Sequence, residues 1–348
     1  MTTYNSPVSD MKMVQHCSVA RAGDILGDPW SFLVLREAFF GVRRFETMQK
    51  NLGIARNLLA SRLKNLTGHG LFTRVLYSAR PPRYEYRLSE RGRELYGIIV
   101  AMLQWGDKWI SGEQGPPLLL FHRTCGSALR QIVVCSECRE PIVPEDLVTQ
   151  KGPGAGASWR DSTAATRHAS DRDVFTRGRY CSVARTLQIV GDRWTFQILR
   201  EAFFGARRFE DIQRSLRIAR NILADRLSRL VADGIFERRL YAERPDRFEY
   251  ALSEKGKELC PVVLAMLTWG DRWLALSGQV PLLFIHKGCG KTFTFLFVCQ
   301  HCGQPLHAGD VRHEPGPGAG FRGWQSDAAE HPAIDARVAE APRKRVAG

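Results

Sequence analysis

Hydrophobic positions in the first third of the chain follow a helical period. From Asp28 the stretch "DPWSFLVLREAFF" places apolar residues three or four positions apart, after an acidic residue and a proline that favour a helix start. The stretch "RRFETMQKNL" predicts a shorter second helix, and "ARNLLASRLKNLTGHG" predicts a third after a tight turn at Gly53. Leu59, Leu63 and Leu66 form an apolar stripe on this third helix and leave a polar face opposite. Two helices, a tight turn and a polar-faced second helix predict a helix-turn-helix.

After Gly70 the period changes to two. The segments "LFTRVLY" and "YEYRL" alternate on either side of "SARPPR", which predicts a β-hairpin, or wing, with arginines at its tip. Ser89 then favours the start of a long helix whose apolar side reaches Trp109. This side is larger than one small domain usually needs, so it either packs within its own domain or pairs with another copy.

The whole pattern recurs 164 residues later without insertion. "REAFFGVRRFE" begins at Arg36 and "REAFFGARRFE" begins at Arg200. The duplication predicts an α+β, mainly α chain with two winged helix-turn-helix domains, each followed by a small Cys-rich, zinc-ribbon-like β extension. The expected boundaries are winged helices at 17–113 and 181–277, extensions at 116–150 and 280–315, a flexible linker at 151–180 and a disordered tail at 316–348.

Composition narrows the classes of function. The 348 residues are 44% hydrophobic, enough for two cores, and the net charge of +14 suits a polyanion such as nucleic acid without proving one. The apolar runs are too short to span a bilayer and the first residues lack the core of a signal peptide, so a cytoplasmic protein is expected. The chain shows no Ser/His/Asp set and no phosphate loop, so we expect no enzyme.

Six of the nine cysteines fall in two identical patterns. "HRTCGSALRQIVVCSEC" and "HKGCGKTFTFLFVCQHC" share a His-x2-Cys-x9-Cys-x2-Cys spacing, which offers three thiolates and one imidazole per copy. We expect each copy to hold one structural zinc ion, with the intervening strand bringing its two ligand pairs together. A bare thiol cluster or redox switch, and no chemistry at all, remain open. The expected ligands are His122, Cys125, Cys135 and Cys138 in the first copy and His286, Cys289, Cys299 and Cys302 in the second.

Several blocks of the sequence resemble the HxlR-type winged-helix transcription regulators of bacteria. These blocks are "CSVARAGDILGDPW", "REAFFGVRRFE", "RLKNLTGHGLFTR", "PPRYEYRLSERG" and "LQWGDKW", and they recur in the second copy. The resemblance covers about Cys17–Trp109 and Cys181–Trp273. It implies a sequence-specific regulator that binds double-stranded DNA at a near-palindromic operator, either as a covalent pseudo-dimer of the two copies or as a homodimer. The alternative is a zinc-stabilised winged-helix interaction protein that has lost specific DNA binding.

The resemblance also implies which residues contact DNA. The recognition helices would run from Ala55 to His69 and from Ala219 to Asp233. Arginine and asparagine make paired hydrogen bonds to guanine and adenine edges, and wing arginines reach phosphates or a minor groove. The alternative for these faces is simple solvation. The implied contacts are Arg56, Asn57, Ser61, Lys64, Arg80 and Arg83 in the first copy and Arg220, Asn221, Ser228, Arg244 and Arg247 in the second.

The sequence departs from the family pattern before both recognition helices. Members usually have serine where this chain has Ala55 and Ala219, so a side-chain cap is expected to be missing. In the second copy Arg217 replaces the turn glycine, and Asp225 adds an anion to the face that would meet phosphates. We therefore expect the second copy to bind DNA more weakly.

Cys17 and Cys181 stand apart from the clusters, at matching helix starts. Some family members sense oxidants or electrophiles with a cysteine near this position, and a helix N-terminus stabilises a thiolate. These two residues are therefore candidate redox sensors. The alternative is that both are small core residues.

Overall fold

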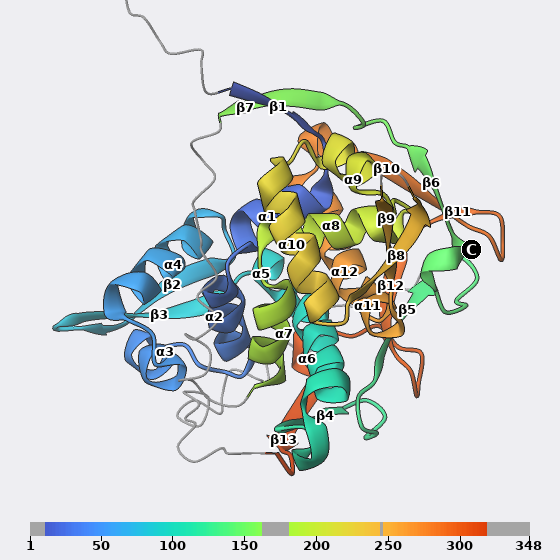
Figure 1. Cartoon of the computed structure of the whole chain (residues 1–348). Helices are drawn as coiled ribbons and strands as arrows, with labels where there is room; N and C mark the ends of the chain where they lie inside the picture. The colour runs from blue at the N-terminus through green and yellow to red at the C-terminus, as the bar shows by residue number, and fades with distance from the viewer. Residues whose placement is uncertain (1–10, 162–180, 244–245, 319–348) are drawn as a thin grey trace, which may run out of the picture.

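The computed structural model describes residues 11–161, 181–243 and 246–318, and both copies contain the predicted helix-turn-helix and wing (Figure 1). The first copy comprises α1 (Ser18–Leu26), α2 (Pro29–Phe39), α3 (Phe45–Leu52), α4 (Arg56–Gly68), β2 (Phe72–Ala79), β3 (Pro82–Leu88), α5 (Glu90–Arg93) and α6 (Tyr96–Ile110). The second comprises α7 (Ser182–Val190), α8 (Arg193–Phe203), α9 (Phe209–Leu216), α10 (Arg220–Ala232), β8 (Phe236–Ala242), β9 (Arg247–Leu252), α11 (Glu254–Lys257) and α12 (Cys260–Leu274).

Local sequence explains where these helices begin and which face they bury. The Asp28 carboxylate accepts a hydrogen bond from the Trp30 amide at 3.0 Å and caps α2, as predicted. Leu59, Leu63 and Leu66 are fully buried along one side of α4. One boundary prediction is wrong: Ser89 caps the short helix α5, and α6 is a separate helix.

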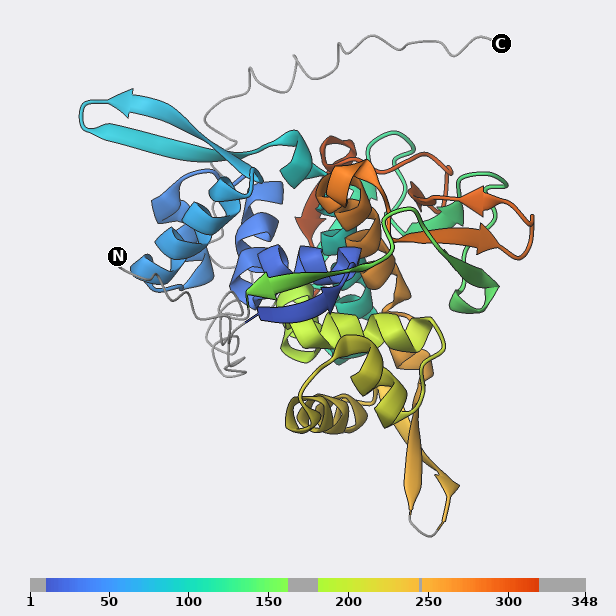
Figure 2. The same cartoon turned by 90° about the horizontal axis from the view of Figure 1, so that it is seen from above.

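The long helices pack between the copies. α6 lies against α7 and α12, and α12 lies against α1 of the first copy, so the excess apolar surface contacts the other copy. The Trp105 indole donates to the Lys255 carbonyl at 2.9 Å, and the Trp269 indole donates to the Arg91 carbonyl at the same distance. The two bonds are related by the 164-residue offset, so the interface is pseudo-symmetric. Figure 2 shows the β2–β3 and β8–β9 hairpins projecting from different sides of the molecule.

Each Cys-rich extension pairs with the extension of the other copy. β4 (Leu118–His122) pairs with β13 (Val311–Pro315), β5 (Gln131–Cys135) with β12 (Phe295–Cys299), and β6 (Leu147–Lys151) with β10 (Leu282–His286), which also pairs with β11 (Thr292–Phe293). All these pairs are antiparallel. The prediction of two separate ribbon-like extensions is therefore wrong, because each copy supplies strands whose partners lie in the other.

Part of the predicted linker is also a strand. β7 (Ala157–Asp161) pairs with β1 (Met11–Gln15), near the start of the chain. A flexible linker over all of 151–180 is therefore wrong for its first third. Residues 162–180, and 319–348 of the predicted tail, lie outside the described residues.

A half-buried carboxylate on each long helix meets a serine of the other copy. The Ser182 hydroxyl donates to Asp107, and the Ser18 hydroxyl donates to Asp271. Burial raises the pKa of both carboxyls from 3.8 to about 6, although the serine bonds and nearby arginines oppose this shift.

The glycine before each of these aspartates allows the close approach. A Cβ added at Gly106 would lie 2.4 Å from the Ser182 carbonyl oxygen, and one at Gly270 would lie 2.5 Å from that of Ser18. Any larger residue would force the helices apart. The repeated "WGD" segment is therefore an interface motif.

These carboxyls predict a pH dependence of stability. Because their folded pKa lies above the unfolded value, the folded state binds protons more tightly, and the unfolding free energy should fall as pH rises from about 4 to 6. The double variant Asp107→Asn, Asp271→Asn should lose this part of the slope. Thermal unfolding at pH 4.5 and 7.5 measures it, with a change of about 1 kcal/mol shifting the midpoint by about 2–4 °C. Identical pH slopes for wild type and variant would refute the assignment.

Candidate DNA-binding surface and metal centres

The recognition helices present the predicted polar faces to solvent. Arg56, Asn57, Ser61 and Lys64 on α4 are all exposed. The Arg56 guanidinium lies 4.9 Å from the ring centroid of Phe45 on the preceding helix, which limits the positions available to the side chain. The second copy repeats this arrangement: Arg220, Asn221 and Ser228 on α10 are exposed, and Arg220 lies 5.0 Å from the ring of Phe209.

The turn before each recognition helix has the expected weaknesses. No side chain caps α4 or α10, whose N-cap residues are Ala55 and Ala219. Gly53 has φ +63° and Arg217 has φ +50°, so both turns need the left-handed conformation. An arginine there costs about 1 kcal/mol relative to glycine, and the strain falls on the second copy alone.

The wings place arginines and an aromatic residue beside the recognition helices. Arg80, Arg83 and Arg247 are exposed, whereas Arg244 lies outside the described residues. On the first wing the Tyr77 ring lies 4.9 Å from the guanidinium of Arg44, and Tyr241 and Arg208 repeat the contact at 4.7 Å. The sequence analysis missed both arginines. The repeated "RRFE" segment was the available signal.

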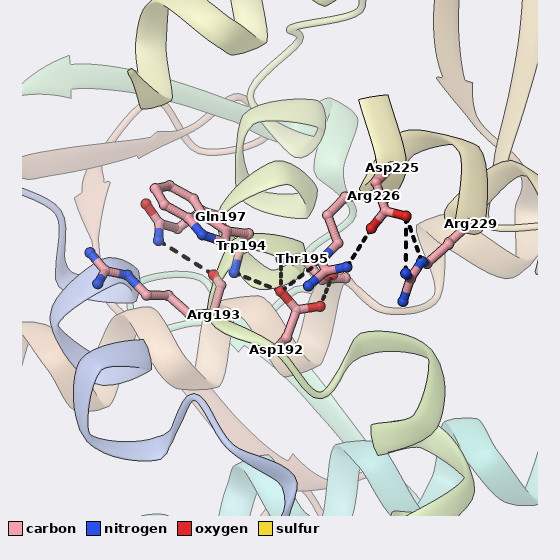
Figure 3. A network of polar contacts seen from close by, with 8 residues as sticks. All are labelled: Asp192, Arg193, Trp194, Thr195, Gln197, Asp225, Arg226 and Arg229. Carbon is pink, nitrogen blue, oxygen red and sulfur yellow. Dashed lines mark hydrogen bonds and ion pairs between the residues drawn. The ribbon is translucent and has the colours of Figure 1, made fainter. Parts of the chain in front are cut away.

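The two recognition faces differ in their charge network. Figure 3 shows the Asp225 carboxylate between two arginines of α10, with Arg226 at 2.7 Å and Arg229 at 3.0 Å. Arg226 also bonds Asp192, the residue that caps α8, at 3.2 Å. In the first copy the equivalent positions hold Ser61 and Asn65. The expected anion is therefore present but locally compensated, and Arg229 is a charged residue of this face that the sequence analysis missed.

The cysteine and histidine side chains gather into two clusters, and each cluster draws ligands from both copies. The first contains His122, Cys125, Cys299 and Cys302. The second contains Cys135, Cys138, His286 and Cys289. The predicted residues are all used, but the predicted grouping of one complete set per copy is wrong.

The distances within the clusters suit a tetrahedral cation. His122 Nδ1 lies 3.4 Å from Cys125 Sγ and 3.3 Å from Cys302 Sγ, and Cys125 Sγ lies 3.9 Å from Cys299 Sγ. In a tetrahedral zinc site, bonds of about 2.3 Å to sulfur and about 2.0 Å to nitrogen place the nitrogen about 3.6 Å from each sulfur atom and the sulfur atoms about 3.8 Å from one another. The sulfur atoms are much too far apart for a disulfide, and all nine cysteines are free thiols.

Strand geometry explains the exchange of ligands. β5 and β12 pair with Cys135 opposite Phe295 and Gln131 opposite Cys299, so their terminal cysteines lie at opposite ends of the ribbon. Five extended residues hold those ends about 13 Å apart. A straight strand therefore separates the two ligand pairs of one copy, and each pair meets the complementary pair of the other copy.

The cluster thiols differ in pKa. Backbone hydrogen bonds with Glu140 and Gln304 lower the pKa of Cys138 and of Cys302, respectively, but burial and the neighbouring cysteines outweigh them and raise both values. A backbone hydrogen bond with Ser127, then a side-chain bond with His122, lowers the pKa of Cys125 to about 6 against the effect of burial. Burial opposes ionisation of Cys135, but bonds with the backbone of Cys138 and Glu137 lower its pKa as well. The buried His122 Nε2 atom has no hydrogen-bond partner in the described structure, while Nδ1 faces the thiols. This donor set matches a soft-metal site.

The candidate redox cysteines lie at the interface between the copies. Cys17 is 7% exposed, accepts from the Ala20 amide at 3.3 Å and contacts Arg200 of the second copy at 2.5 Å. Cys181 lies beside Arg36 of the first copy, whose pKa burial would lower but contacts with Glu37 and Cys181 raise. Each cysteine therefore meets an arginine of the opposite copy.

A search of the described residues finds no helix long and apolar enough to cross a membrane.

The fold and the exposed recognition helices define a winged helix-turn-helix transcription regulator. Residues 25–114 and 189–277, just over half of the chain, match the model of the HxlR-like helix-turn-helix family. The chain belongs to this family.

The chain is also similar to individual proteins. The uncharacterized HTH-type transcriptional regulator Rv3095 of Mycobacterium tuberculosis is 47% identical over 145 residues, which cover 42% of this chain and 92% of that relative. A relative of the same description in Synechocystis is 40% identical over 98 residues, 28% of this chain and 73% of its own length. The structure of the redox regulator HypR in its reduced form is 36% identical, with coverage of 26% and 89% and a TM-score of 0.25. The Mycobacterium relative is thus about as long as one copy.

Proposed function

We propose that the chain is a sequence-specific DNA-binding regulator in which the two copies act as a covalent pseudo-dimer on one near-palindromic operator. The observation that supports this function most directly is the exposed Arg-Asn face of α4 and its counterpart on α10. Residues in the first turns of a recognition helix reach base edges in the major groove. The two copies that carry these faces are joined by the tryptophan hydrogen bonds, which recur at the 164-residue offset.

Selection from randomised duplexes tests the proposal. A motif with two related half-sites should be enriched, and the affinity for it should exceed non-specific affinity by about 10³-fold or more at physiological salt. The alternative function, a zinc-stabilised interaction protein without specific DNA binding, predicts no motif and only salt-dependent binding. Either result is measurable with the full chain.

The two half-sites should contribute unequally. Lys64 on the first face corresponds to Ser228 on the second, and Asp225 binds Arg229, the exposed arginine of the second face. That arginine has less freedom to contact phosphates. The operator should therefore be an imperfect palindrome whose stronger half binds the first copy.

Paired arginine variants measure this inequality. Arg56→Ala should weaken binding to the selected operator more than Arg220→Ala does, with a loss of about 1–3 kcal/mol for a lost guanine contact. Arg130→Ala removes the same charge from an exposed position of the extension and is the matched control. Titrations at one fixed salt concentration suffice. Equal losses and a symmetric footprint would contradict the expected order.

We propose that each Cys/His cluster holds one structural Zn²⁺ ion. Four protein ligands fill a tetrahedral site and leave no open position for catalysis. Metal analysis of protein purified without chelator should find about two zinc ions per chain. No zinc, together with six cluster thiols that react freely in the folded protein, would refute the assignment.

Sensing of oxidants by Cys17 and Cys181 also stays a prediction. Each lies beside an arginine of the opposite copy in the interface, so an oxidant must reach them there. The double variant Cys17→Ser, Cys181→Ser should abolish any change of operator affinity on oxidation. A response of unchanged size in this variant would remove both residues as sensors.

A further inference from the structure

The two clusters join the copies through the Cys-rich extensions, outside the paired long helices. One cluster combines the first ligand pair of the first copy, His122 and Cys125, with the second ligand pair of the second copy. The other cluster has the reverse composition. Neither copy alone contains a complete set in space, although each contains one in sequence.

We propose that the clusters are metal clasps, in which a Zn²⁺-like divalent cation ties the extension of one copy to that of the other and thereby fixes the relative position of the two recognition helices. Each cation would bind three thiolates and one neutral imidazole and release three thiol protons. The part of this proposal that concerns DNA rests on the function proposed above, whereas the metal part does not.

The strands that join the extensions form narrow ribbons. β5–β12 and β4–β13 are two-stranded sheets, so few ladder hydrogen bonds hold the extensions of the two copies together. A cation at each end of the β5–β12 ribbon would hold both strands in register, because the ligands extend beyond both strand ends. The metal would act at both ends of this five-residue ladder.

The extensions also contact the helices that support the DNA-binding units. The Gln131 side chain of β5 donates to the Gly97 carbonyl of α6 at 3.0 Å. At the end of α2, the Phe40 ring lies 5.2 Å from the ring of His313 on β13 of the other copy. A shift of the extensions would therefore be transmitted to α2 and α6, against which α4 and α7 pack.

Two triple variants, each lacking three thiols, distinguish the exchanged from the sequential ligand sets. Cys135→Ser, Cys138→Ser, Cys289→Ser leaves the exchanged set at His122 complete, so the full chain should retain one tightly bound Zn²⁺ after dialysis against a chelator. Cys125→Ser, Cys135→Ser, Cys138→Ser leaves no exchanged set complete and should retain none. The reverse result, or two ions in either variant, would overturn the proposal.

The wild-type chain gives a measurement that does not depend on the folding of the variants. Limited oxidation of the metal-free chain, followed by peptide mapping, should join Cys125 to Cys299 or Cys302, since these sulfur atoms share a cluster. Disulfides between Cys125 and Cys135, or the absence of any disulfide between the copies, would overturn the exchanged arrangement.

The effect on DNA is tested with the selected operator and with one isolated half-site. Removing the metal from the wild-type chain should lower affinity for the full operator about tenfold or more and change half-site affinity much less, because two fixed heads bind with a high effective concentration. Equal losses on both DNAs, or no loss, would overturn the role in positioning. If no operator can be selected at all, the proposed function fails, and the metal counts still decide whether the clasps exist.

Discussion

The close contact of the long helices with the opposite copy is the constraint on which the rest of the structure depends. α6 and α12 are too apolar to face water, and each finds its partner across the interface. Gly106 and Gly270 permit an approach that a single added carbon would prevent, and the two indole bonds fix its register. Once the helices are paired, the winged-helix units at one end and the extensions at the other have fixed places.

The exchange of extension strands follows from this pairing. Because α6 leads directly into the first extension and α12 into the second, antiparallel partners meet across the interface. Strand pairing then separates the two ligand pairs of each copy by the length of one strand. The metal ligands are thus brought together by the interface, and the spacing within one copy only supplies the correct side chains. The exposed recognition helices remain outside this arrangement.

Sequence reasoning predicted the parts that depend on local pattern. The cap of α2, the leucine stripe of α4, the wings and the missing caps of the recognition helices all follow from residues close together in the chain. The grouping of the cluster ligands could not be predicted from the spacing. Both copies contain the same four ligands at the same spacing, so the sequence fits a set within one copy as well as a set shared between the copies. The pairing of β1 with β7 and the salt bridges of Asp225 are likewise set by tertiary placement.

A duplication within one chain separates two requirements that a homodimer must satisfy with one sequence. The interface needs both halves alike, and here the repeated Trp-Gly-Asp segment of the long helices and all eight cluster ligands are identical at the 164-residue offset. The recognition helices share Arg56 and Asn57 with their counterparts but differ where Asp225, Ser228 and Arg229 stand. In the DNA-binding function proposed above, residues near the helix start reach the bases most directly, so the shared pair would read the same bases in both half-sites. The later turns are free to diverge, so such half-sites would share a core and differ at its flank.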